Sequence, residues 1–196
     1  GIAGILDAMR AGRGLGPLGL GRCRTLVSRG ANELIAAALE AEGQETERLL
    51  GEFRAIYRAA PSGPEDLFAG VAEVLETLAA RNLRMAVCSN KPQALCEKVI
   101  AECGIGERFS AVFGGDRAKH PKPDGRHVEE ALAALGLAPG EALYVGDSSI
   151  DHAAAAEAGV PFVLAAYGYT DFPDGDPPGW SIQAPPELLT LLDRIS

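Results

Sequence analysis

From about residue 70 onward, short apolar runs alternate with segments in which apolar residues recur at helical spacing. The runs contain few polar interruptions and are expected to be buried strands at 84–88, 111–113, 142–146 and 161–166. The helical spacing predicts helices at 71–81, 92–103, 126–135, 150–158 and 186–194, with a short fifth strand at Ser181-Ile182. Continuously apolar strands that alternate with helices are typical of a parallel sheet covered by helices on both faces.

The first 65 residues have a different pattern, with no convincing strand. Helical periodicity predicts helices at about 2–10, 30–42 and 45–59. The glycine-rich stretch 12–21 is expected to be a loop between helices, because no strand precedes it and no Gly-Lys-Ser/Thr follows as in a phosphate-binding loop. The segment 61–64, which holds two prolines and a glycine, indicates a turn or linker. We therefore predict an α-helical domain at 1–66 and an α/β domain at 67–196.

Composition narrows the classes of partner. The formal net charge of −9 argues against nucleic acid or an anionic membrane, but not against a small phosphate ester. No run of 18 apolar residues and no leader pattern is present, so we expect a cytoplasmic protein. Cys23, Cys88, Cys96 and Cys103 show no metal-ligand spacing and are expected to be buried free thiols.

Polar side chains follow three of the predicted strands. Ser89-Asn90 comes directly after the first, Lys122 lies in the loop after the second, and Asp147 follows the third. Asp151 falls in the first turn of the next helix. Because the carboxyl ends of parallel strands meet at one edge of a sheet, where ligands bind in open α/β folds, these residues are expected to converge.

These residue types suit a phosphoryl group beside a cation. The two carboxylates, Asp147 and Asp151, offer the oxygen ligands that Mg²⁺ prefers. Ser89 can hydrogen-bond a phosphoryl oxygen with help from helix-start N–H groups, and Lys122 can neutralise developing charge. Each residue also has a structural alternative: an N-capping Asp with a dipole-favoured first-turn Asp, an N-capping Ser89, and a solvated loop charge at Lys122.

At these positions the chain resembles the haloacid-dehalogenase-like hydrolases, and within them the phosphoglycolate phosphatases with a helical cap. The family pattern is a strand ending in Ser/Thr-Asn, then Lys-Pro, then Gly-Asp-x-x-x-Asp. Here these are Ser89-Asn90, Lys122-Pro123 and Gly146-Asp147 through Asp151. The resemblance covers nearly all of the chain and implies a Rossmann-like α/β core with an inserted α-helical cap. It also implies phosphate binding by Ser89, Asn90 and Lys122, catalysis by Lys122 and Asp147, and Mg²⁺ held by Asp147 and Asp151.

One element of the family pattern is missing. The family's nucleophile is an Asp in a DxDGT motif on the first core strand, and no such motif occurs in these 196 residues. Asp7 lies on a helical pattern and cannot substitute. We expect the motif upstream of Gly1 in an active enzyme, in preference to a catalytically dead protein.

The missing motif predicts a structural consequence. The family's strand order places the first strand between the strands that end at Ser89 and Asp147. Its loss would leave about ten ladder groups unpaired, at roughly 1–3 kcal/mol each, against a total stability of ~5–15 kcal/mol. The chain should therefore fold poorly by itself, unless the two flanking strands close up on each other.

The function that the resemblance implies is a Mg²⁺-dependent phosphatase of a small phosphate monoester such as phosphoglycolate, acting through an aspartyl-phosphate. The alternatives are another enzyme of the superfamily, such as a sugar-phosphate phosphatase or a β-phosphoglucomutase, and an inactive phosphate-binding homologue. In the cap, Arg29 is a candidate for pairing with a substrate carboxylate, with a plain surface role as the equal alternative.

Overall fold

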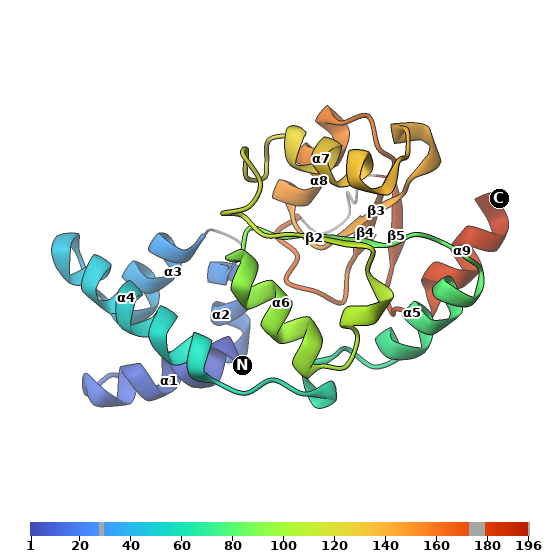
Figure 1. Cartoon of the computed structure of the whole chain (residues 1–196). Helices are drawn as coiled ribbons and strands as arrows, with labels where there is room; N and C mark the ends of the chain where they lie inside the picture. Colours follow the sequence, from blue (N-terminus) through green and yellow to red (C-terminus); the bar gives the residue numbers. More distant parts are fainter. Residues whose placement is uncertain (28–29, 173–178, 196) are drawn as a thin grey trace. The chain divides into compact units, whose positions relative to one another are not determined.

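The computed structural model describes residues 1–27, 30–172 and 179–195, and they form two compact units (Figure 1). One unit comprises residues 1–61 and 169–171, and the other comprises residues 62–168 and 172–196. The contacts thus divide the chain after Pro61, whereas the sequence places the domain boundary after residue 66.

The first unit is helical throughout its described secondary structure. It contains α1 (Ile2–Gly12), α2 (Leu20–Val27), α3 (Ala31–Leu39) and α4 (Gly43–Ala59). Its core is built from apolar side chains that all four helices contribute, among them Leu6, Leu26, Ile35, Leu39 and Leu49. The apolar periodicity therefore located three of the four helices correctly.

Helix α2 was not predicted, since the sequence indicated a loop at 12–21 and no helix before residue 30. Only Cys23 and Leu26 of this helix are buried, and Leu20 at its start is 70% exposed. Eight residues with two buried side chains carry little periodic signal, and a helix of that length depends on tertiary packing, here against α3.

The second unit alternates helices and strands in the predicted order. Its helices are α5 (Val71–Ala80), α6 (Gln93–Glu102), α7 (Arg126–Leu135), α8 (Ser149–Glu157) and α9 (Glu187–Ile195). Its strands are β1 (Ala86–Cys88), β2 (Ala111–Phe113), β3 (Tyr144–Gly146), β4 (Phe162–Ala165) and β5 (Trp180–Ile182). Short 3₁₀ helices η1 (Pro64–Asp66), η2 (Gly106–Arg108) and η3 (Pro139–Glu141) complete it. Helices α7 and α8 lie on one side of the strands, with α5, α6 and α9 on the other (Figure 1).

The described strands form two separate parallel sheets. One has the order β1-β2, with Val87 opposite Val112, and the other has the order β3-β4-β5, with Val145 opposite Val163 and Leu164 opposite Ser181. The predicted α/β class with parallel strands and a helical unit is confirmed.

The break between the sheets falls between β1 and β3, the two strands that the family order places on either side of the first strand. These two strands have not closed up on each other, since each is hydrogen-bonded only to β2 or β4 among the described strands. Val145, in the middle of β3, is 39% exposed, whereas all four residues of β4 are buried. The edge of β3 toward β1 thus has no strand partner among the described strands.

Two further sequence predictions concern the whole chain. The four cysteines are free thiols, of which three are buried and Cys88 is half-buried. Within the described ranges, no helix combines the length and the apolar character that crossing a membrane requires.

Candidate active site

The predicted site residues lie at the carboxyl ends of neighbouring strands. Ser89 and Asn90 follow β1, Lys122 lies in the loop between β2 and α7, and Asp147 follows β3. Asp151 is the third residue of α8. Hydrogen bonds join all of these residues except Ser89, so the strand order brings them together as expected.

Lys122 is the centre of the cluster. Its Nζ donates to Asp151 Oδ1 at 2.6 Å, to the carbonyl oxygen of Cys88 at 3.0 Å and to the hydroxyl of Tyr144 at 3.1 Å. An ammonium has three N–H donors, so each has an acceptor in the protein. The side chain is 10% exposed, which excludes the alternative of a solvated loop charge and makes Lys122 the bridge between β1 and β3.

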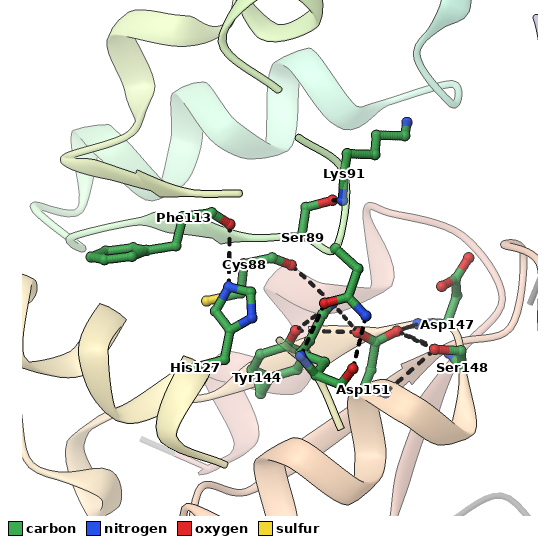
Figure 2. Close-up of polar contacts among 11 residues, drawn as sticks. Cys88, Ser89, Lys91, Phe113, His127, Tyr144, Asp147, Ser148 and Asp151 are labelled. Carbon is green, nitrogen blue, oxygen red and sulfur yellow. Dashed lines mark hydrogen bonds and ion pairs between the residues drawn. The ribbon is translucent and has the colours of Figure 1, made fainter. Parts of the chain in front are cut away.

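Asp151 is held through both of its carboxylate oxygens (Figure 2). Oδ1 accepts from Lys122 and, at 3.2 Å, from the Tyr144 hydroxyl. Oδ2 accepts from the Ser148 hydroxyl at 2.6 Å and from the N–H groups of Ser148 and Asp147 at 3.2 and 3.3 Å. Ser148, not Asp147, is therefore the N-cap of α8, and Asp151 closes its capping box.

The Lys122–Asp151 pair sets the electrostatics of the site. Burial by itself would raise the pKa of Asp151. The charge and hydrogen bond of Lys122, with the hydroxyls of Ser148 and Tyr144, outweigh that effect and hold the pKa below its usual value. Burial and the Asp151 charge raise the pKa of Tyr144, so its hydroxyl stays protonated. Burial also raises the pKa of the Cys88 thiol to about 11.

Asp147 packs closely against a glycine in the loop after β4. A methyl group at Gly168 would lie 2.4 Å from Asp147 Oδ2 and 2.5 Å from Asp147 Cβ. Any other residue at 168 would push the aspartate away, because such separations are shorter than atomic contact allows. Figure 2 shows the Asp147 carboxylate directed away from the hydrogen-bonded cluster around Asp151.

Ser89 and Asn90 lie in the turn that leads from β1 into α6. The hydroxyl of Ser89 accepts from the N–H of Lys91 at 3.2 Å, while the N-cap of α6 is Pro92, so Ser89 is not the helix cap. The side-chain amide of Asn90 is bonded to the main chain of Lys122 in both directions: Nδ2 donates to the carbonyl oxygen at 2.8 Å, and Oδ1 accepts from the N–H at 2.9 Å.

Three residues of this region were not singled out from the sequence. Tyr144 contacts both members of the Lys122–Asp151 pair, and Gly168 packs on Asp147. His127 is fully buried, with Nε2 3.3 Å from the carbonyl oxygen of Phe113. The tyrosine three residues before the strand-end aspartate was visible in the sequence. Its contact with Lys122 was not.

Two carboxylates of the cluster could serve as ligands for a cation. Asp147 and Asp151 provide oxygen ligands of the kind Mg²⁺ prefers, but the described residues contain no group of three His, Cys, Asp or Glu side chains that could hold a metal ion. The oxygens of Asp151 are already engaged by Lys122 and Ser148, so this carboxylate would have to exchange those partners to bind a cation directly. Further ligands would have to come from substrate, water or residues that this chain does not contain.

Two other residues entered the sequence argument as candidates. Arg29, the candidate for substrate recognition, lies outside the described residues. Asp7 lies in α1, where its Oδ1 accepts from the N–H of Leu18 at 2.8 Å, so it has a structural role within the helical unit.

Known proteins share this arrangement of sequence and fold. The phosphoglycolate phosphatase of Caulobacter vibrioides is 36% identical over 177 residues, which cover 88% of this chain and 75% of that protein. The N-acetylmuramic acid 6-phosphate phosphatase of Pseudomonas aeruginosa is 33% identical over 199 residues, covering 97% of this chain and 86% of that protein. The crystal structure of a predicted phosphoglycolate phosphatase from Haemophilus somnus has the same fold, with a TM-score of 0.81 at 24% identity over 97% of this chain and 90% of that one.

The family model agrees with these relatives. A model described as haloacid dehalogenase-like hydrolase matches residues 5–165, which include most of the helical unit, Lys122 and the Asp147–Asp151 segment. The resemblance carried by Ser89-Asn90, Lys122-Pro123 and Gly146-Asp147 is thereby confirmed, and the chain belongs to the haloacid dehalogenase-like hydrolase family.

Proposed function

We propose that the protein hydrolyses a small phosphate monoester of a carboxylic acid, with phosphoglycolate as the first candidate, in a Mg²⁺-dependent reaction. The observation that carries the proposal is the buried Lys122 ammonium, held between the ends of β1 and β3 beside Ser89, Asp147 and Asp151. A fixed positive charge there, next to a helix start and two carboxylates, fits a phosphoryl group whose charge grows in the transition state. The similarity to two phosphatases supports this choice.

The residues of this chain would bind and orient the phosphoryl group. Ser89 would donate a hydrogen bond to a phosphoryl oxygen, and Lys122 would offset the charge that develops on the equatorial oxygens. Asp147 and Asp151, on exchanging their present partners, would hold a Mg²⁺ ion, which would neutralise charge at the phosphoryl oxygens.

The nucleophile is proposed to be an aspartate that these 196 residues do not supply. Its carboxylate would attack phosphorus, the ester P–O bond would break, and the leaving oxygen would take a proton from solvent to become the alcohol. Water would then hydrolyse the acyl phosphate, which releases inorganic phosphate, restores the carboxylate and returns a proton to solvent. The edge of β3 toward β1, which has no partner among the described strands, supports a further strand at this place, because that strand would bring its carboxyl end to Lys122 and Asp147.

Localisation of the protein in the cytoplasm stays a prediction.

A second candidate substrate is a phosphorylated amino sugar that carries a carboxylate. The relative from Pseudomonas aeruginosa is an N-acetylmuramic acid 6-phosphate phosphatase, and N-acetylmuramic acid, like glycolate, bears a carboxylate. Both candidates thus need a cation that recognises a carboxylate beyond the phosphate, a role that we keep for Arg29 as a prediction.

The test is phosphatase activity of the protein expressed from its complete gene. We expect release of phosphate from phosphoglycolate or N-acetylmuramic acid 6-phosphate that EDTA abolishes and Mg²⁺ restores, and that Lys122→Met lowers at least 100-fold. Arg29→Ala should raise KM for these acids more than for p-nitrophenyl phosphate. Absence of activity toward every phosphate monoester in a folded, Mg²⁺-supplied sample would favour the phosphate-binding alternative, and equal KM effects would remove Arg29 from substrate recognition.

A further inference from the structure

The main chain of Lys122 is fixed by a single side chain. The Asn90 amide makes two hydrogen bonds to it, one to the carbonyl oxygen at 2.8 Å and one from the N–H at 2.9 Å. The two residues are 32 positions apart, on different loops that follow β1 and β2. An amide bonded in this two-point manner sets both the position and the orientation of the partner peptide, in contrast to a single hydrogen bond.

The other end of Lys122 is fixed by the Tyr144 hydroxyl. That hydroxyl accepts from Lys122 Nζ at 3.1 Å and donates to Asp151 Oδ1 at 3.2 Å. A tyrosine hydroxyl has one proton to donate and can also accept, and here both roles are used. It therefore orders the Lys122–Asp151 pair without adding charge to the site.

We propose that Asn90 and Tyr144 are positioning residues that hold Lys122 from its two ends, Asn90 through the main chain and Tyr144 through the ammonium group. Asn90 then acts through Lys122 and does not itself bind the phosphoryl group with its side chain. This proposal rests on the proposed function only in taking a phosphoryl group as the ligand of Lys122. The hydrogen bonds that hold Lys122 in place belong to the fold itself.

The first measurement is independent of catalysis. Asn90→Ala removes the acceptor of the Lys122 N–H, so hydrogen exchange of that amide should accelerate at least tenfold, while amides within α7 keep their rates. The variant should fold, because the Asn90 side chain is exposed and water can replace its bonds. Asn32→Ala, the same substitution at an exposed position of α3, is the control and should leave the hydrogen-exchange rate of the Lys122 amide unchanged. An unaltered Lys122 exchange rate in Asn90→Ala would overturn the hold through the main chain.

The second measurement is a double-mutant cycle on the enzyme expressed from the complete gene. Asn90→Ala and Tyr144→Phe should each lower kcat/KM about 10- to 100-fold, mainly through kcat, since a misplaced charge acts on the transition state. In the Lys122→Met background both substitutions should have less than a twofold effect, because residues that act through Lys122 lose their role with it. If Asn90→Ala costs the same factor in both backgrounds, the side chain contacts substrate directly and the proposal is wrong.

The two measurements separate the proposals. If the wild-type protein shows no phosphatase activity, the proposed function fails while the exchange experiment still decides whether Asn90 holds Lys122. If the protein is active and the exchange rate of Lys122 does not respond to Asn90→Ala, the function stands and the hold is refuted. Tyr144→Phe removes only one oxygen atom and keeps the ring stacked on Phe162, so this variant should fold. If the Asn90 variant failed to fold, the double-mutant cycle of Tyr144→Phe with Lys122→Met would still test the proposal.

Discussion

Gly146→Ala tests whether the end of β3 and the start of α8 are packed as tightly as the structure shows. A methyl group at Gly146 would lie 2.5 Å from Asp151 Cβ, 2.7 Å from Cγ and 3.0 Å from Oδ2. Ordinary contacts between carbon atoms are about 3.5–4.0 Å, so the overlap is about 1 Å. Asp151 has no room to turn aside without giving up the ion pair with Lys122 or the bonds to Ser148.

The expected cost follows from that overlap. Forcing an extra methyl group into a packed site destabilises a protein by about 1–3 kcal/mol. With a urea m-value of about 2 kcal/mol/M, the midpoint of unfolding should fall by roughly 0.5–1.5 M. The single tryptophan, Trp180, lies in the same sheet as Gly146, so its fluorescence reports the unfolding of this unit.

Gly140→Ala is the matched control for this prediction. It makes the same change in η3 of the same unit, where a methyl group would meet nothing within 4 Å. Its free energy of unfolding should stay within about 0.5 kcal/mol of wild type, as is usual for surface substitutions, which is a change of about 0.25 M in the midpoint. Equal midpoints for the two variants would refute the close packing of Gly146 on Asp151.

Three further predictions follow from single side chains. Burial lowers the pKa of His127 below 6.5, so its neutral form contributes stability fully above about pH 6.5 and loses it as the pH falls toward the folded pKa. Between pH 6.5 and 5, the free energy of unfolding should therefore decrease less steeply in His127→Gln than in wild type, by up to about 1.4 kcal/mol per pH unit. Equal slopes in the two proteins would exclude the effect. Ser148→Ala removes the N-cap of α8 and should cost about 1 kcal/mol in urea unfolding; no loss would mean that the Asp151 carboxylate caps the helix alone. With a pKa of about 11, Cys88 should react with iodoacetamide at pH 8 at least ~100-fold more slowly in the native than in the urea-unfolded protein, and similar rates would contradict its burial.

The elements of the α/β unit followed from periodicity because their signals are local. The run around Val145 and the helical spacing after Ser148 predicted β3 and α8 within two residues of their observed bounds. Chain order then placed Ser89, Lys122 and Asp147 at one sheet edge, since parallel strands share the direction of their carboxyl ends. Helix α2 was missed because its stability depends on contacts with α3 and not on its own sequence.

The fine structure of the site had no comparable local signal. The roles of Asp151 at the metal and of Asn90 at phosphate stay predictions. What the sequence did not indicate is that Asp151 is bonded to Lys122 and Ser148, and Asn90 to the main chain of Lys122. The contacts of Tyr144 with Lys122 and of Gly168 with Asp147 had no signal in the sequence, because the partners are 22 and 21 residues apart.

By itself, then, the sequence determined the class of fold, the order of its elements, the family and the set of polar residues at the strand ends. Those features depend on residue types and their spacing along the chain, which the sequence specifies directly. Tertiary structure decided which acceptors take the three protons of Lys122, which residue caps α8, and that β1 and β3 do not pair with each other. These outcomes depend on atomic distances between residues that are far apart in sequence, and a difference of 1 Å there separates a hydrogen bond from none.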